Sequence, residues 1–211
     1  MHASSSPCRR AFAAACFGLA VLFAAGQACA SGPSFDCSRT RKGSIESEVC
    51  KNKDLAALDR ALAEVFEAAT KIAANEHPPT LRAEQRGWIK GRNDCWKSKD
   101  RRTCIAESYR LRIAELEARY RLAPSSGPVW YSCDDAPGSE VVVTYFGTEP
   151  STLIAERGDQ TSLMYCQPAA TGNVCSGRNE SLEKCNGDVI VVWGYEARPM
   201  RCTPTRPQPA Q

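Results

Sequence analysis

Pro124-Ser125-Ser126-Gly127-Pro128 is a segment of helix and strand breakers within the 211-residue chain. Proline and glycine interrupt regular structure, so such a cluster is typical of a connection between structural units. Helical periodicity precedes it and short β-rich runs follow it. We therefore expect a helical domain over residues 31–123, a linker over 124–129, a β-domain over 130–204 and a disordered tail over 205–211.

The part before the linker has the pattern of amphipathic helices. After Asp54, a predicted N-cap, apolar residues recur at three- and four-residue steps. This first stripe consists of Leu55, Leu58, Leu62, Val65, Ala69 and Ile72. Further helices are expected to begin near Thr80 and near Thr103. Their predicted core residues are Leu81, Trp88, Ile89, Ile105, Tyr109, Ile113, Leu116 and Tyr120. The pattern predicts a small all-α bundle.

The part after the linker has the pattern of antiparallel β-structure. Five short β-rich runs are expected to be strands, over residues 130–133, 140–146, 151–156, 162–166 and 189–193. Turn sequences separate several of them, at Asp135–Gly138, Arg157–Asp159 and Asn186–Asp188. Such runs predict an antiparallel sheet or barrel. The fold class is therefore α+β in separate domains, with the helices first.

The first thirty residues have the pattern of a secretory signal. Arg9 and Arg10 precede an apolar run over residues 11–26, which is shorter than the roughly 20 residues that span a bilayer. We expect cleavage after Ala30, no stable membrane span and a periplasmic or secreted protein. A lipid anchor on Cys29 is the alternative.

Cysteine is abundant after the predicted signal. The nine residues are Cys37, Cys50, Cys95, Cys104, Cys133, Cys166, Cys175, Cys185 and Cys202. In an exported chain this density predicts disulfides rather than reactive thiols. Because nine is odd, one thiol stays free, pairs with another chain, or pairs with a retained Cys29.

The spacing suggests which cysteines pair. In the helical part we favour the local pairs Cys37 with Cys50 and Cys95 with Cys104, while Cys50 with Cys95 remains open. Cys133 lies on the first predicted strand and Cys202 follows the last. A bond between these two would tie the ends of the β-domain together.

Charge divides at the same boundary. Residues 31–123 hold 19 Lys+Arg against 14 Asp+Glu, whereas residues 124–211 hold 6 against 10. Acidic and basic residues are interleaved in the helical part, which is typical of solvated helix faces. We therefore expect no nucleic-acid partner. The acidic β-part suits a basic protein partner.

The sequence offers little for metal or catalytic chemistry. It has no Cys-x-x-Cys pair, and His77 is the only histidine after the predicted signal, so we expect no metal and no cofactor. Asp134-Asp135 is the only adjacent acidic pair in the β-part, and consecutive residues of a strand or turn point apart. The least favoured alternative is therefore a hydrolase. A binding protein, and not an enzyme, is predicted.

Short motifs in the helical part follow a recognisable order. They are Phe35–Cys37, Glu48–Cys50, Leu55–Asp59, Glu84–Trp88, Arg92–Cys95, and Cys104 with Tyr109, Arg112 and Ile113. In order and approximate spacing they resemble the LprI-type lysozyme inhibitor domain, an exported bacterial family with four cysteines. The resemblance covers nearly all of residues 34–120. Most of the matching residues are cysteines and helix-face apolar residues, so it implies a fold more than an activity.

Three motifs in the β-part also follow a known order. They are Tyr131–Asp135, Ala155–Thr161 and Arg201–Pro204. They resemble the opening strand, the central hairpin and the closing cysteine of the c-type lysozyme inhibitor family, the MliC and PliC proteins. The resemblance implies an eight-stranded β-barrel that binds c-type lysozyme.

The same resemblance implies a binding site. In this family a barrel loop enters the lysozyme cleft, and a lysine farther along the chain joins it. Matched residue by residue, Thr171 falls on the loop's key serine, Gly172 on its glycine and Lys184 on the lysine. Two departures concern the loop's aromatic residue, which is Cys175 here, and the tryptophan before the lysine, which is Leu182. They bear on potency and choice of target more than on the fold.

The implied residues suit the chemistry of the target. A c-type lysozyme uses two carboxyl groups, one held protonated in an apolar environment and one ionised. The Thr171 hydroxyl can donate to one and accept from the other, and the Lys184 ammonium can make a charge-assisted hydrogen bond. Without the resemblance, Thr171-Gly172 is an ordinary hairpin tip and Lys184 a solvated charge. We predict an inhibitor of c-type lysozyme. The alternative is a cell-envelope protein-binding module that has lost lysozyme blockade.

Overall fold

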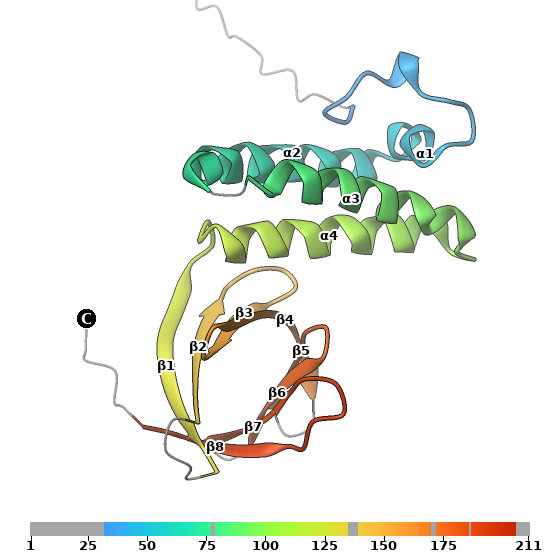
Figure 1. The fold of residues 1–211 in the computed structure, drawn as a ribbon. Helices are drawn as coiled ribbons and strands as arrows, with labels where there is room; N and C mark the ends of the chain where they lie inside the picture. The colour runs from blue at the N-terminus through green and yellow to red at the C-terminus, as the bar shows by residue number, and fades with distance from the viewer. Residues whose placement is uncertain (1–31, 77–78, 135–138, 170–171, 186, 206–211) are drawn as a thin grey trace, which may run out of the picture. The chain divides into compact units, whose positions relative to one another are not determined.

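The computed structural model describes residues 32–76, 79–134, 139–169, 172–185 and 187–205. Helices occupy the first part of the described chain, and an antiparallel closed barrel of eight strands follows (Figure 1). The predicted fold class is therefore confirmed.

The helical part contains four α-helices. They are α1 (Ile45–Lys51), α2 (Lys53–Ile72), α3 (Leu81–Asn93) and α4 (Arg101–Arg119), with short 3-10 turns η1 (Cys37–Arg39), η2 (Ala73–Asn75) and η3 (Asp94–Lys97). Helix α4 packs against both α2 and α3. The residues that are fully buried between them include Leu55, Ala69, Ile105, Tyr109 and Leu116. All five belong to the predicted stripes, because helical periodicity places them on one face.

The structure differs from the predicted helices in three respects. Helix α1 was not expected, and α2 begins after Asn52 as its N-cap rather than after Asp54. Helix α4, in contrast, begins near Thr103 as expected: it starts at Arg101, and the Asp100 side chain accepts a hydrogen bond from the Thr103 backbone N–H. Ile72 and Ile89 were expected in the core but are 53% and 38% exposed, since the last turn of α2 and one side of α3 face solvent.

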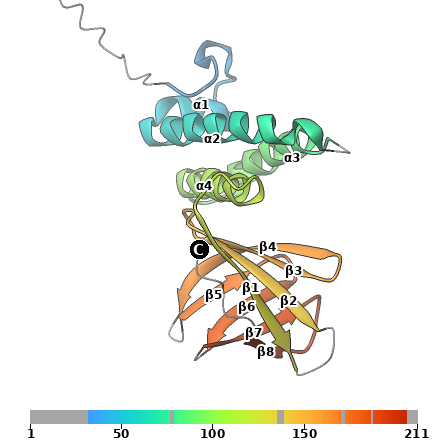
Figure 2. The same ribbon diagram turned by 90° about the vertical axis from the view of Figure 1, so that its left-hand side faces the viewer.

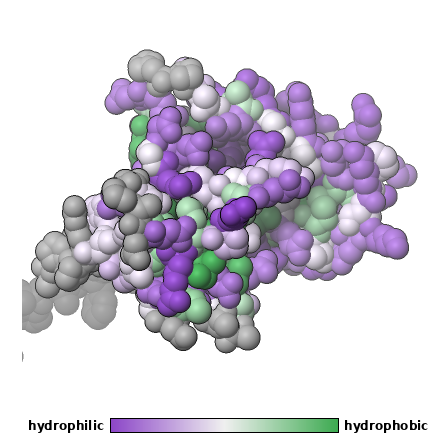
Figure 3. Space-filling view, turned by 60° about the horizontal axis from the view of Figure 1, so that its bottom comes forward, coloured by the Kyte–Doolittle hydropathy of each residue, from purple (hydrophilic) through white to green (hydrophobic). Residues whose placement is uncertain are grey.

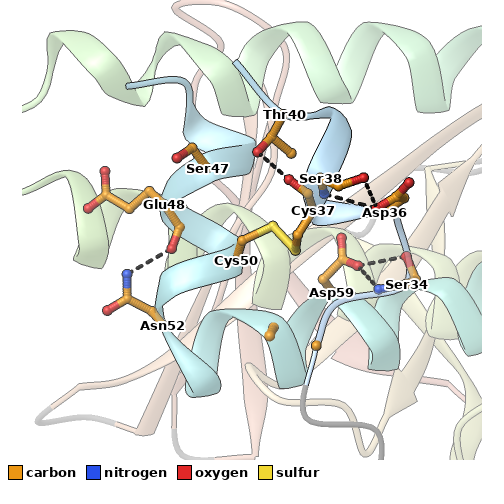
Figure 4. Close-up of a disulfide and its surroundings, with 12 residues drawn as sticks. Ser34, Asp36, Cys37, Ser38, Thr40, Ser47, Glu48, Cys50, Asn52 and Asp59 are labelled. Atoms are coloured by element: carbon orange, nitrogen blue, oxygen red, sulfur yellow. Dashed lines mark hydrogen bonds between the residues drawn. A yellow bond between two sulfur atoms is a disulfide. The ribbon is translucent and has the colours of Figure 1, made fainter. Parts of the chain in front are cut away.

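Two disulfides cross-link the helical part, one near its start and one at the connection between α3 and α4. Cys37 on η1 is bonded to Cys50 on α1 (Figure 4), and Cys95 on η3 is bonded to Cys104 on α4. These are the local pairs favoured above, and the alternative between Cys50 and Cys95 does not form. Helix α1 is only seven residues long, and such short helices are marginal without tertiary support. The bond to η1 supplies part of that support.

The strands form one closed barrel. They are β1 (Ser125–Cys133), β2 (Glu140–Phe146), β3 (Thr152–Arg157), β4 (Gln160–Ala169), β5 (Gly172–Ser176), β6 (Glu180–Cys185), β7 (Asp188–Trp193) and β8 (Met200–Pro204). Each strand pairs with the next in the sequence, and β1 pairs with β8 to close the barrel (Figure 2). Their inward residues form a core that includes Val141, Val143, Leu153, Leu182 and Val191.

The first strand begins five residues earlier than expected. Its register against β2 shifts between Ser126 and Val129, around Gly127-Pro128. Gly127 has φ 110°, and a Cβ there would lie 2.8 Å from the Val143 carbonyl oxygen. Glycine and proline are tolerated in strands at such irregularities. The breaker segment therefore lies partly inside the sheet instead of forming a separate connection.

Two further disulfides belong to the barrel. Cys133 on β1 is bonded to Cys202 on β8, and Cys166 on β4 to Cys175 on β5. Cys185 is the free cysteine of the described residues. The bond between β1 and β8 joins the two strands that close the barrel.

The face seen in Figure 3 is largely hydrophilic, with separate smaller hydrophobic areas. No helix within the described ranges is long and apolar enough to cross a membrane.

Candidate functional site

The barrel brings two of the three predicted site residues together. Gly172 begins β5 and Lys184 lies near the end of β6. A Cβ on Gly172 would lie 3.5 Å from both the Cβ and the carbonyl oxygen of Lys184. Thr171 directly precedes Gly172 in the sequence but lies outside the described residues. The backbone of β5 and the Lys184 side chain therefore share one end of the barrel.

Lys184 extends over the barrel end rather than away from it. It alternates with Glu183 along β6 and so lies on the same face of the strand as Leu182, which is fully buried in the core. Its Nζ atom lies 4.5 Å from the centroid of the Tyr145 ring on β2. The side chain as a whole remains exposed. The ammonium therefore lies beside an aromatic ring, on a side chain that is exposed as a whole.

Contacts inside the barrel hold the Tyr145 side chain in place. Its ring packs against the barrel core, and its hydroxyl lies 3.2 Å from the hydroxyl of buried Tyr131. Burial, and then the hydrogen bond and charge repulsion involving Tyr131, raise the pKa of Tyr145 well above its ordinary value. The ring is therefore neutral at physiological pH and presents an ordinary aromatic face to Lys184.

A disulfide spans the hairpin that precedes the site. Residues Ala169 and Gly172 are paired at the tip of β4 and β5, and Cys166 and Cys175 are paired three residues farther in. The bond between the two cysteines cross-links the base of this hairpin. Since Cys175 is 2% exposed, the residue that replaces the family's loop aromatic serves the barrel core.

The helical part contains a separate buried polar network. Asp59 on α2 is 7% exposed, and its carboxylate accepts a hydrogen bond from the Tyr109 hydroxyl at 2.8 Å. It also accepts one from the Ser34 backbone N–H at 2.7 Å (Figure 4). Arg92 on α3 donates to the Tyr109 hydroxyl at 2.7 Å and to Glu46 at 2.7 Å. The network therefore links the segment before η1 to all four helices, since Glu46 lies on α1.

A surface pocket lies over this network. It has a volume of about 320 Å³. It is lined by Ser34, Phe35, Glu46, Asp59, Leu62, Ala63, Phe66, Gln85, Trp88, Ile89 and Arg92. Trp88 packs edge-to-face on Tyr109 with 5.2 Å between the ring centroids and donates from its indole N–H to the Ser108 carbonyl. The Ser34, Glu46, Asp59 and Arg92 groups that line the pocket take part in the hydrogen-bonded network. Their presence is therefore accounted for by the stability of the helical fold.

Glu46 gives this network a pH dependence. Burial opposes its ionisation, but hydrogen bonds from a backbone N–H and Asn93, together with the charge of Arg92, outweigh burial and lower the pKa of Glu46 below its ordinary value. A lowered pKa stabilises the fold above the unfolded-state value, and that contribution is lost as pH falls through the folded-state value. We expect Glu46→Gln to lower the free energy of unfolding at pH 7 more than at pH 3. Urea unfolding followed by circular dichroism at 222 nm measures this difference, and an equal effect at both pH values would contradict it.

The described residues show no grouping suited to a metal. No cluster of three or more His, Cys, Asp or Glu side chains suited to a metal occurs among them. The Asp134 carboxylate accepts a hydrogen bond from the Arg201 backbone N–H at 3.0 Å. Its neighbour Asp135 lies outside the described residues, as does His77. Asp134 therefore has a local structural contact.

Sequence reasoning missed Tyr145 and Tyr131. Tyr145 follows Val141 and Val143 at two-residue steps, so the alternation of a strand assigns it to the inward face. Its contact with Lys184 depends on which strands lie opposite in the closed barrel, and no local pattern reports that. The buried network of Asp59, Arg92 and Tyr109 was missed for the same reason, because its members are far apart in the sequence.

Comparisons with known proteins agree with the two-part architecture. A family model described as "Lysozyme inhibitor LprI" matches residues 37–116, and one described as "Membrane-bound lysozyme-inhibitor of c-type lysozyme" matches residues 131–198. Proteins named "Lipoprotein LprI" from Mycobacterium bovis and Mycobacterium tuberculosis are 27% identical over 131 residues, which cover 62% of this chain. The chain spans 64% of the length of these relatives. No solved structure matches it. The LprI model therefore matches the helical part and the c-type lysozyme-inhibitor model matches the barrel, in this N-to-C order, and both models describe lysozyme inhibitors.

Proposed function

We propose that this chain is an exported inhibitor of c-type lysozyme, and that the barrel end carrying Gly172 and Lys184 blocks the lysozyme active-site cleft. The observation that carries the proposal is the adjacency of these two residues within the region that matches the MliC model. A cation at an exposed barrel end complements a cleft that contains an ionised carboxylate. The acidic balance of the β-part also suits a basic target.

The loop before Gly172 completes the proposed site. Thr171 would supply a hydroxyl to the lysozyme carboxyl groups, beside the Lys184 ammonium. The bond between Cys166 and Cys175 supports this role because it restricts the hairpin before binding and so reduces the entropy lost on binding. Gly172 has φ 133°, a backbone conformation that a residue with a side chain rarely adopts.

The proposed location is the cell envelope. The first thirty residues have a signal pattern, the matching model is described as membrane-bound, and the curated relatives are named lipoproteins. Cleavage after Ala30 and a lipid anchor on Cys29 are the two alternatives for the mature N-terminus. Both place the inhibitor where an external lysozyme meets the cell wall.

Lys184→Ala tests the site. The purified mature chain should suppress cell-wall lysis by c-type lysozyme at about one inhibitor per enzyme. The variant should bind the enzyme roughly 1–3 kcal/mol more weakly, because one charge-assisted hydrogen bond is lost in a desolvated cleft.

Arg178→Ala is the matched control for Lys184→Ala. Arg178 is an exposed cation in the connection between β5 and β6, at the opposite end of the barrel. Its loss should leave inhibition unchanged. Undiminished lysis in excess wild-type protein would contradict inhibition itself, whereas equal effects of the two substitutions would contradict the assigned barrel end.

The second candidate is a cell-envelope protein-binding module without lysozyme blockade. It is favoured by Cys175 and Leu182, which replace the family's loop aromatic residue and the tryptophan before its lysine and are here 2% and 0% exposed. Two aromatic groups of the family would thus be absent near the proposed site. Binding of another envelope protein, together with undiminished lysis, would support this candidate.

A further inference from the structure

Lys184 contacts a residue on the far side of its own barrel. It lies on β6, whereas Tyr145 lies on β2, and three strands separate them in either direction around the closed barrel. The 4.5 Å between the lysine Nζ and the tyrosine ring centroid therefore bridges the barrel end. A lysine that simply extended into solvent from β6 would not make this contact.

We propose that Tyr145 is a positioning residue for Lys184, holding the ammonium over the barrel end in the orientation that engages an anionic group of the lysozyme cleft. This inference rests on the proposed function, because Lys184 must first be a contact residue. It adds that the Tyr145 ring holds the Lys184 ammonium in its binding orientation before lysozyme is bound.

The contact offsets a known weakness of lysine as a recognition group. A free lysine side chain has a flexible four-carbon stem, and it loses rotamer freedom when a partner holds its ammonium in one position. An ammonium near an aromatic face is attracted by the ring quadrupole, and its N–H groups that point away from the ring can still donate to an acceptor. Tyr145 therefore limits the positions of the Lys184 ammonium without using all its hydrogen-bonding capacity.

The ring can act in this way because it is fixed. The Tyr145 hydroxyl lies 3.2 Å from the hydroxyl of Tyr131, whose side chain is 6% exposed. The ring also packs against the barrel core. Tyr131 thus holds the hydroxyl end of the Tyr145 side chain, while the face of the Tyr145 ring is turned to Lys184.

The local backbone keeps the lysine stem in place. A Cβ at Gly172 would lie 3.5 Å from the Lys184 Cβ, so the start of β5 passes close beside the stem. Gly172 and Tyr145 consequently act on different parts of the same side chain. Gly172 lies beside the Lys184 Cβ, and the Tyr145 ring contacts the Lys184 ammonium.

Substitutions of Tyr145 separate positioning from general stability. Tyr145→Leu removes the ring face and should weaken lysozyme inhibition about 3- to 10-fold. Tyr145→Phe keeps the ring and removes only the hydroxyl, so it should retain inhibition within about two-fold. In the Lys184→Ala background, Tyr145→Leu should have no further effect, because the group that the ring positions is gone.

The free protein provides a readout that does not depend on lysozyme. Protons above an aromatic ring resonate upfield, so the Lys184 ε-methylene signal in the NMR spectrum should be shifted upfield from that of an exposed lysine. Lys184→Ala identifies the signal by removing it. Tyr145→Phe should keep the shift and Tyr145→Leu should abolish it.

The outcomes distinguish the two proposals. An unshifted Lys184 signal in the wild-type protein would overturn the positioning role even if no Tyr145 variant folds. Additive effects of Tyr145→Leu and Lys184→Ala on inhibition would overturn it as well. If Lys184→Ala leaves inhibition intact, the proposed function at this site fails, and the role of Tyr145 in inhibition fails with it, although the ring contact in the free protein stands.

Discussion

Replacing Cys133 and Cys202 together by alanine should lower the free energy of unfolding of the barrel by roughly 4 kcal/mol. The two cysteines are 69 residues apart in the sequence, and both are fully buried. Their bond joins β1 to β8, the strands that close the barrel. Without it the unfolded chain gains the freedom of a long open loop, and the closing pair is held by backbone hydrogen bonds and packing alone.

The second barrel disulfide is the matched control. Cys166 and Cys175 are 9 residues apart, so replacing both by alanine should cost only about 3 kcal/mol in the same entropy model. Urea unfolding followed by tryptophan fluorescence compares the two double variants. A larger loss from Cys166 and Cys175 than from Cys133 and Cys202 would contradict the assignment of the long-range bond as the main restraint on the barrel.

Asp59→Ala should destabilise the helical part by about 3 kcal/mol, because it leaves buried donors without their acceptor. Asp59 accepts from the Tyr109 hydroxyl and from the backbone N–H and hydroxyl of Ser34. Tyr109 is fully buried and also receives a hydrogen bond from Arg92. Removing the carboxylate therefore leaves the positive charge of Arg92 less compensated in a region of low solvent access.

Asp54 provides the comparison for Asp59. It lies on the same helix and pairs with Arg102, but its side chain is 57% exposed. Asp54→Ala should leave the free energy of unfolding nearly unchanged, because solvent screens exposed ion pairs. Circular dichroism at 222 nm during urea unfolding measures both variants. Similar losses from the two substitutions would show that the buried network does not carry the stability assigned to it.

The features that sequence predicted well are local ones. The stripe through Leu55 and Leu62, and the stripe through Ile105, Tyr109 and Leu116, are buried because helical periodicity is a property of neighbouring turns. The hairpin over Arg157–Asp159 forms as expected, with Arg157 paired to Gln160 and Gly158 at φ 61°. The paired cysteines of the helical part are also close in the sequence, which favoured the two local pairs that form.

The features that sequence did not predict depend on distant residues. Helix α1 has too few residues for a clear periodic pattern, and β5 and β6 are short strands with polar residues in most positions. Lys184 was described either as a family contact or as a solvated charge. Its contact with Tyr145 follows only from barrel closure, which sets residues of β2 and β6 opposite each other.

Competition with a ligand of the lysozyme cleft tests the central proposal most directly. The affinity of the mature chain for c-type lysozyme can be measured by titration calorimetry with and without a saturating short oligosaccharide of N-acetylglucosamine, which fills the substrate cleft. If the barrel end enters that cleft, the oligosaccharide should lower the apparent affinity in proportion to its occupancy. An affinity that is unchanged by the oligosaccharide would contradict the account, because the barrel and the substrate would then occupy different surfaces of the enzyme.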